Sequence, residues 1–120
     1  MVRLSMVLSG SRSNARHLAA ALKSLMAVTR LEAACTDCCV WVDPDSRVHY
    51  FEEWMTEHDL ERRIRSDRFT WLLAVMEASE QTPSIRFDFL ASSRGLDYVA
   101  EVRGADERST AIGDVPPTGW

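Results

Sequence analysis

The sequence has no long apolar segment and only a few cysteines. None of its segments approaches the roughly 18 apolar residues that a membrane-spanning helix requires. The N-terminal segment MVRLSMVLSGSRSN has only a short apolar run and no small-residue cleavage pattern after it, so we predict no signal peptide. The 3 cysteines cannot all pair within one chain. Reduced thiols, and therefore a cytoplasmic location, are the expectation.

Clustered positive charge is also missing. The 120 residues carry a formal net charge of −4, whereas a nucleic-acid surface requires grouped Lys and Arg side chains. The one arginine-rich run, ERRIRSDR at positions 61–68, is interleaved with Glu and Asp, which is typical of a solvated helix face. We therefore predict no nucleic-acid partner and no membrane partner for a chain of single-domain length.

Sequence signatures of the common cofactors are absent. The chain contains no GxGxxG, GxxxxGK[ST], HExxH or GxSxG motif, so the sequence predicts no flavin, nicotinamide or nucleotide cofactor. Cys35-x-x-Cys38-Cys39 raises two alternatives, a zinc site and a redox pair. Adjacent Cys38 and Cys39 on a strand point to opposite faces, and no histidine has matching spacing, which argues against a metal. A redox CxxC motif precedes a helix, and this one enters a strand, so structural thiols are favoured.

Hydrophobic periodicity predicts an α+β domain. Period-two alternation predicts four strands, at Val2–Ser9, Cys38–Asp43, Arg47–Met55 and Ile85–Phe89. Helical spacing predicts one helix capped by Ser13 and ending near Leu31, a second from Thr56 to Met76 with a kink near Ser66-Asp67, and a short C-terminal helix over Leu96–Arg103. The order β-α-β-β-α-β predicts a ferredoxin-like fold, with a four-stranded antiparallel sheet and both main helices on one face. Residues 1–104 form the predicted domain, and residues 105–120 a flexible tail.

The third predicted strand carries large side chains on both faces. Tyr50, Glu52 and Trp54 point one way and His49 the other, because side chains alternate along a strand. We assign Tyr50, Glu52 and Trp54 to the face that the helices leave bare. An apolar bare face of this size is large for a monomer, so we predict a homodimer that packs sheet face to sheet face. Tyr50 and Trp54 are then either pocket residues or interface anchors.

The second predicted helix adds three candidates to this site. They are Arg63, Arg68 and Trp71, although Trp71 lies beside the apolar stripe of that helix, which favours packing in the core.

The segment from Cys35 to Phe69 resembles the antibiotic biosynthesis monooxygenase family. The motifs that carry the resemblance are Ala34-Cys35, Asp43-Pro44-Asp45, Glu52-Glu53-Trp54, Leu60 and Ser66-Asp67-Arg68-Phe69. With the strand order it extends over about Val2 to Phe89. It implies a dimeric α+β barrel with a cavity between sheet and helices, in which a phenolic or quinol-type aromatic is oxidised by O2 without metal or flavin. Trp54 would line this cavity and Glu52 would fix the strand end.

The sequence departs from the family where members often have histidines on the second helix. This chain has Arg62-Arg63-Ile64 at one such place and Arg68 at another. Arginine stabilises an anion but cannot act as a base at neutral pH. The base would then be His49, His58 or Glu52, with Arg63 steadying the substrate oxygen.

Two other functions stay open. One is a non-catalytic dimeric module that binds a small molecule or regulates, which the missing histidines favour, since a fold alone does not set a function. The other is a thiol switch at Cys35, Cys38 or Cys39. The haem-degrading branch of the fold is disfavoured, because Asn14 lies at a helix start and no histidine follows Trp71.

Overall fold

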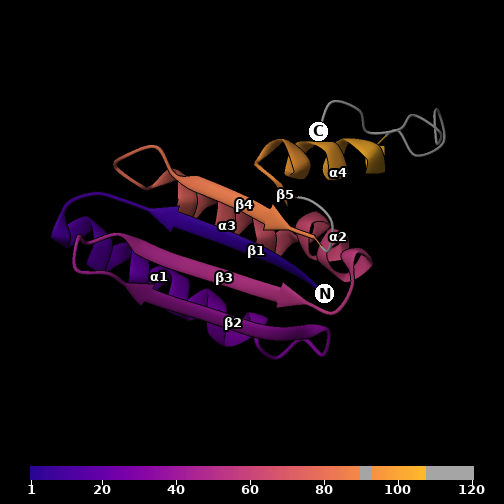
Figure 1. Ribbon diagram of the computed structural model, residues 1–120, viewed down its shortest axis with the longest axis horizontal. Coiled ribbons are helices and arrows are strands. Elements are labelled where there is room, and N and C mark those ends of the chain that lie inside the picture. Colours follow the sequence, from indigo (N-terminus) through magenta and orange to yellow (C-terminus); the bar gives the residue numbers. More distant parts are fainter. Residues whose placement is uncertain (90–92, 108–120) are drawn as a thin grey trace.

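The computed structural model describes residues 1–89 and 93–107. Along the chain the elements are β1 (Val2–Leu8), α1 (Arg12–Thr29), β2 (Cys35–Val42), β3 (Val48–Trp54), α2 (Glu57–Arg65), α3 (Asp67–Glu77), β4 (Ser84–Asp88), β5 (Ser93–Arg94) and α4 (Asp97–Glu107). The strands form one antiparallel sheet in the order β2-β3-β1-β4-β5 (Figure 1). The predicted α+β arrangement is confirmed, with β5 as a two-residue addition at the edge of the four longer strands.

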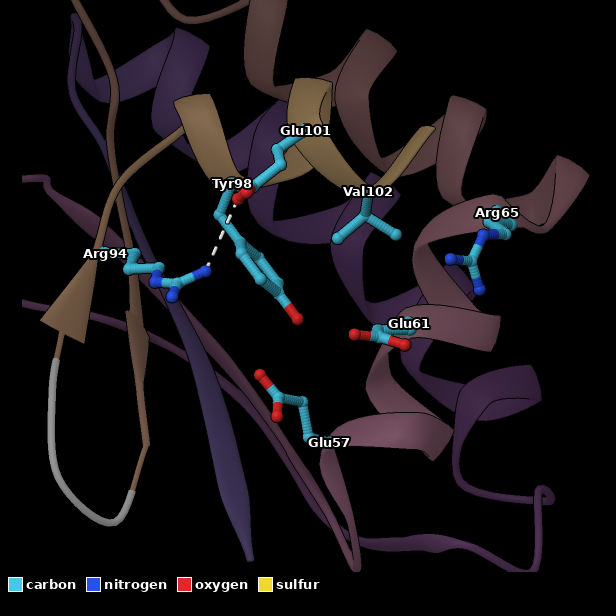
Figure 2. A pocket seen from close by; sticks show the side chains of 7 residues that line it. All are labelled: Glu57, Glu61, Arg65, Arg94, Tyr98, Glu101 and Val102. Atoms are coloured by element: carbon cyan, nitrogen blue, oxygen red, sulfur yellow. Dashed lines mark hydrogen bonds and ion pairs between the residues drawn. The ribbon is translucent and has the colours of Figure 1, made fainter. Parts of the chain in front are cut away.

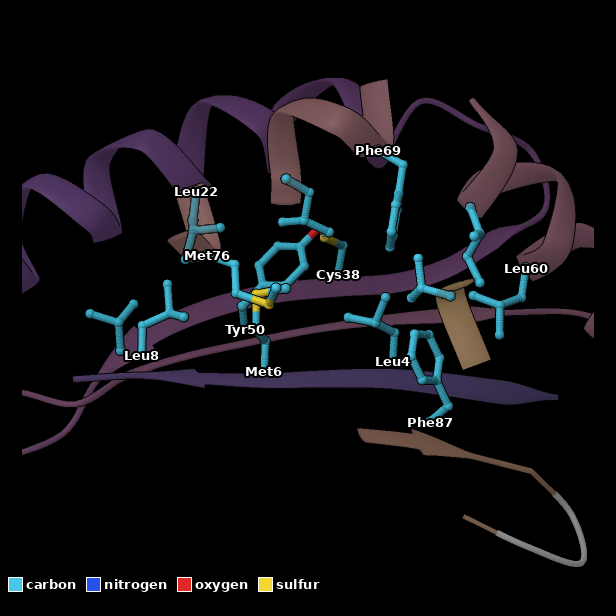
Figure 3. Packing of buried hydrophobic residues seen from close by; sticks show 14 of the residues in the cluster. Leu4, Met6, Leu8, Leu22, Cys38, Tyr50, Leu60, Phe69, Met76 and Phe87 are labelled. Carbon is cyan, nitrogen blue, oxygen red and sulfur yellow. Dashed lines mark hydrogen bonds between the residues drawn. The ribbon is translucent and has the colours of Figure 1, made fainter. Parts of the chain in front are cut away.

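The hydrophobic core lies between one face of the sheet and the helices. Strand β1 buries every second residue, and Figure 3 shows Leu4, Met6 and Leu8 pointing toward the helical layer. From that layer Leu22 of α1 and Phe69 of α3 point back toward the strands. Helix α4 packs against α2 at the other end of the layer. None of the helices in the described part of the chain combines the length and hydropathy needed to cross a bilayer.

Side-chain caps fix where α1 and α2 begin. The Ser11 hydroxyl accepts the N–H of Asn14 at 3.1 Å, so the cap of α1 lies two residues before the predicted Ser13. Thr56, the predicted start of the second helix, caps α2, because its hydroxyl accepts the N–H of Asp59 at 3.1 Å. Ser66 has extended backbone angles, φ −75° and ψ 155°, which cannot continue a helix. The predicted kink is therefore a complete break, and it separates α2 from α3.

Tyr50, Glu52 and Trp54 lie under the helices, and the assignment of these residues to the bare face is wrong. Their side chains are 1%, 0% and 1% exposed, and the backbone register pairs Glu52 with the buried residues Leu4 and Cys38. The grouping by alternation was correct, but alternation does not tell which group faces the helices. On the covered face, Arg63 reaches down from α2 and pairs with Glu52 inside the core.

Trp71 and the C-terminal helix also differ from prediction. Helix α3 buries Phe69, Leu72 and Met76, and this leaves Trp71 on its outer side, where it is 66% exposed instead of packed in the core. Helix α4 extends to Glu107, three residues into the predicted tail of residues 105–120. The rest of that tail, residues 108–120, lies outside the described residues.

Candidate functional site

A buried ion pair joins β3 to α2. The Arg63 guanidinium donates from Nη2 to Oε2 of Glu52 at 2.7 Å and from Nε to Oε1 at 3.1 Å. The two side chains are 2% and 0% exposed. Burial lowers the pKa of Arg63, but hydrogen bonding to Glu52 and the charge of Glu52 outweigh this effect, so the pKa is raised above its ordinary value. The Arg63 guanidinium therefore stays charged, and its contact with the carboxylate is bidentate.

Aromatic neighbours complete the shell of the Glu52 carboxylate. Trp54 donates its indole N–H to Oε1 at 3.0 Å, and Tyr50 donates its hydroxyl to Oε2. The Cys38 thiol in turn donates to the Tyr50 oxygen at 3.4 Å. Burial, and then the charge of Glu52, raise the pKa of Tyr50 far above its ordinary value. With two donors on each oxygen, Glu52 is fully satisfied and acts as a scaffold group that holds α2 on the sheet.

The structure separates the other predicted site residues from this cluster. His49 lies on the open face of the sheet, where it stacks on Trp41 with ring centroids 4.9 Å apart. Its Nε2 lies 2.9 Å from Oδ2 of Asp43, and hydrogen bonds from His49 and Arg47 hold the pKa of Asp43 well below its usual range. Arg68 is exposed and pairs with Glu32 at 3.4 Å. The exposed Trp71 of α3 also contributes nothing to the cluster.

A pocket of about 330 Å³ lies between α2, α4 and the end of β5. Its volume falls at the lower end of the range for small-molecule sites. Figure 2 shows the lining side chains converging from these three elements; they are Glu57, Glu61, Arg65, Arg94, Tyr98, Glu101 and Val102. The pocket therefore combines an aromatic and an aliphatic wall with carboxylate and guanidinium groups.

Tyr98 is the most unusual group in this pocket. Its side chain is 2% exposed, yet its hydroxyl has no hydrogen-bond partner among the described residues. Buried hydroxyls are normally paired, so an unpaired one marks a place for a partner. Figure 2 shows the hydroxyl directed into the space beside Glu57 and Glu61. Burial, followed by the charges of Glu61 and Glu57, raises the pKa of Tyr98, so the phenol stays protonated.

Arg94 supports Tyr98 from the sheet. Its guanidinium carbon lies 5.2 Å from the centroid of the Tyr98 ring, and its NH1 is 3.4 Å from Oε2 of Glu101. Tyr98 also packs against Phe87 and Phe89, each with ring centroids 5.1 Å away. These contacts hold the phenol ring in a defined orientation at the pocket wall.

The described residues offer no cluster of metal ligands. Within residues 1–89 and 93–107, no three His, Cys, Asp or Glu side chains lie close enough together to hold a metal ion. Cys35, Cys38 and Cys39 are free thiols. Burial raises the pKa of Cys38 to about 12, and burial also raises that of Cys35.

Comparison with known proteins places the fold. No model of a known protein family and no curated protein sequence matches the chain. A candidate antibiotic biosynthesis monooxygenase from Deinococcus radiodurans is similar in structure, with a TM-score of 0.66 at 20% identity over 77% of this chain and 94% of that chain. Another from Nitrosomonas europaea has a TM-score of 0.63 at 10% identity over 74% and 97%. PA3566 from Pseudomonas aeruginosa has a TM-score of 0.61 at 26% identity over 73% and 91%.

The chain has the fold of the antibiotic biosynthesis monooxygenases. The resemblance drawn from Cys35 to Phe69 is thus confirmed at the level of the fold. Of the site residues predicted from the sequence, the structure brings Tyr50, Glu52, Trp54 and Arg63 together, in the core and not on the bare face of the sheet.

Sequence reasoning missed the pocket residues of this monooxygenase fold. Glu57 and Glu61 are spaced one helical turn apart on α2, and Tyr98 lies in the helical pattern of α4 together with Val102. That spacing was the one signal in the sequence for the pocket residues. It did not show that α2 and α4 pack together.

Proposed function

We propose that the protein is a cofactor-independent monooxygenase that oxidises a small phenolic or quinol-type aromatic with O2. The pocket between α2, α4 and β5 carries this proposal, because it places carboxylates beside a buried phenol hydroxyl that lacks a partner among the described residues. Proteins with the same fold are named as monooxygenases, which supports the reaction type.

The pocket supplies the groups that such a reaction needs. Tyr98 stays protonated, so its hydroxyl can donate to the substrate oxygen, while Glu61 accepts the phenolic proton. The resulting phenolate passes one electron to O2, and the two radicals combine to form the new C–O bond. One oxygen atom then stays in the quinone product and the other leaves as water. Substrate and O2 balance this reaction without a further reductant, and the protein contributes positioning and proton transfer.

The buried Glu52–Arg63 pair has a supporting role in this proposal. It fixes α2, the helix that carries Glu57 and Glu61, against β3 through contacts of 2.7 and 3.1 Å. A rigid element positions site residues more accurately than a mobile one. Tyr50 and Trp54 therefore act on the substrate indirectly, through the carboxylate that they hold.

The open face of the sheet supports the proposed homodimer. It carries Trp41, which is 46% exposed, stacked on His49, and Phe51 under the Arg3 guanidinium at 4.2 Å. Interfaces are enriched in Trp, Phe and Arg. We place the contact between two copies on this face, opposite to the helices that border the pocket.

Oxygen consumption tests the catalytic proposal. The full chain is incubated with a panel of mono- and dihydroxybenzenes, and O2 uptake is followed together with quinone absorbance. We expect uptake above the uncatalysed rate, a loss with Glu61→Gln, and no loss with Glu77→Gln, a carboxylate at the end of α3 that does not line the pocket. Uptake equal to the background rate with every substrate overturns the proposal.

The second candidate, a non-catalytic binding module, has one observation in its favour. His17 and His58 are exposed and His49 lies on the open sheet face, so the pocket lining contains no histidine among the described residues. A ligand that raises the melting temperature but yields no product by mass spectrometry would support this candidate over the monooxygenase.

A further inference from the structure

The charges in the pocket are unequal. Its lining has three carboxylates, from Glu57, Glu61 and Glu101, and two guanidinium groups, from Arg65 and Arg94. Arg94 and Glu101 pair with each other at 3.4 Å. One negative charge therefore remains in excess, and it lies on the α2 side of the pocket.

Glu57 and Glu61 form a like-charge pair on one helix face. They are four residues apart on α2, a spacing at which two negative charges destabilise a helix. Neither carboxylate has an ion-pair partner among the described residues. Glu57 gains stability from its place in the first turn of α2, but Glu61 lies farther along and gains less.

The Tyr98 hydroxyl points toward Glu57 and Glu61 (Figure 2). It is buried, has no partner within the described part of the chain, and faces the two carboxylates (Figure 2). A phenol oxygen accepts a hydrogen bond from an ammonium N–H, and an ammonium has three such donors. One ammonium group could thus contact Glu57, Glu61 and Tyr98 together.

We infer that the pocket binds a small aromatic that carries a protonated amine, with the ammonium between Glu57, Glu61 and the Tyr98 hydroxyl. The aromatic ring of the ligand packs against Val102 and the wall of the pocket near Tyr98. Because Glu61 and Tyr98 then hold an ammonium instead of a phenolic hydroxyl, this inference goes beyond the proposed oxidation and concerns binding alone.

Three phenols test the inference. They share the same ring and differ in the charge of the side chain that it carries. Tyramine carries an ammonium, 4-ethylphenol is neutral, and 4-hydroxyphenylacetate carries a carboxylate. Binding to the full chain is measured by titration calorimetry under anaerobic conditions, so that no oxidation occurs. We expect tyramine to bind at least about fivefold more tightly than 4-ethylphenol, and 4-hydroxyphenylacetate most weakly, since a partly exposed ion pair contributes up to about 1 kcal/mol.

Substitutions in the pocket test which side chains contact the ammonium of the ligand. Glu61→Gln should remove the preference for tyramine over 4-ethylphenol, and Tyr98→Phe should reduce it, while Glu77→Gln should leave it unchanged. Circular dichroism checks that each variant is folded. Equal affinity for tyramine and 4-ethylphenol overturns the inference, and so does a tyramine preference that survives Glu61→Gln in a folded protein.

Different experimental results would contradict the monooxygenase proposal and the ammonium inference. A preference for tyramine that is lost with Glu61→Gln, together with no O2 uptake in air with any of the phenols, would support this inference and contradict the monooxygenase. Oxidation of all three phenols with equal affinity would support the monooxygenase and overturn this inference.

Discussion

Arg63 of α2 and Glu52 of β3 form a bidentate ion pair inside the core, with donor–acceptor distances of 2.7 and 3.1 Å and at most 2% exposure of either side chain. Charges taken out of water are costly unless they are paired and fully hydrogen-bonded. Here Tyr50 and Trp54 supply the remaining donors to the carboxylate. The pair is therefore a single unit, and removal of one member leaves the other charge unpaired.

The first prediction concerns this unit. Arg63→Ala should lower the free energy of unfolding by about 3–5 kcal/mol, because it leaves Glu52 charged and buried. The double variant Glu52→Leu/Arg63→Met should be more stable than Arg63→Ala, since it removes both charges and keeps apolar volume. Urea denaturation measures both values. Arg62→Ala is the control, because Arg62 is exposed and its pair with Asp59 contributes about 1 kcal/mol or less.

The fold could be predicted from the sequence because the signals for it are local. Alternation along Val48–Trp54, the Thr56 cap and the break at Ser66 each depend on residues close together in the chain. Which face of β3 the helices cover appears only in contacts between elements, such as that of Glu52 with Arg63, and no local pattern contains such a contact.

The pocket could not be predicted from the sequence for the same reason. It forms where α4 packs on α2, so Tyr98 meets Glu57 and Glu61 from about forty residues away, at a separation that periodicity does not describe. The cluster of Tyr50, Glu52, Trp54 and Arg63 was predictable as a group because three of its members lie on one strand face. Its role in holding α2 on the sheet required the distances.

The second prediction compares two buried tyrosines, one with a hydrogen-bonded hydroxyl and one whose hydroxyl has no partner among the described residues. Tyr50→Phe removes a hydroxyl that donates to a charged, buried carboxylate, and should cost about 1.5–3 kcal/mol of stability. Tyr98→Phe removes a hydroxyl that has no partner within the described residues, and should leave stability unchanged or slightly higher. Thermal or urea unfolding distinguishes the two. Equal losses for both variants would contradict the assignment of these hydroxyls.

The third prediction concerns thiol reactivity. Cys38 is fully buried and its pKa is raised to about 12, so it carries almost no thiolate at pH 8. In the native protein an aromatic disulfide reagent should therefore modify the same number of thiols in the wild type and in Cys38→Ala. A loss of one fast-reacting thiol in the variant would show that Cys38 is accessible. It would then support the hypothesis of a thiol switch at this position.

The fourth prediction is a loss of stability at alkaline pH. The unfolded Cys38 thiol ionises near pH 9.0, whereas in the folded chain its pKa is about 12. The unfolded state therefore binds fewer protons between these values, and the free energy of unfolding falls as the pH rises through that window. The raised pKa values of Tyr50 and Tyr98 act in the same direction above pH 10. Urea midpoints measured from pH 8 to 11 test this, and the fall should be smaller in Cys38→Ala.

The fifth prediction concerns the open face of the sheet. Trp41 is 46% exposed there and stacks on His49, so a second copy packed on this face would bury it. Trp41→Glu places a charge in that contact and should convert a dimer into a folded monomer in sedimentation velocity at micromolar concentration. Trp71→Glu is the matched control, because Trp71 is 66% exposed on the outer side of α3 and should leave the dimer intact. Loss of the dimer with Trp71→Glu alone would move the interface to the helical side, and a wild-type monomer would remove it altogether.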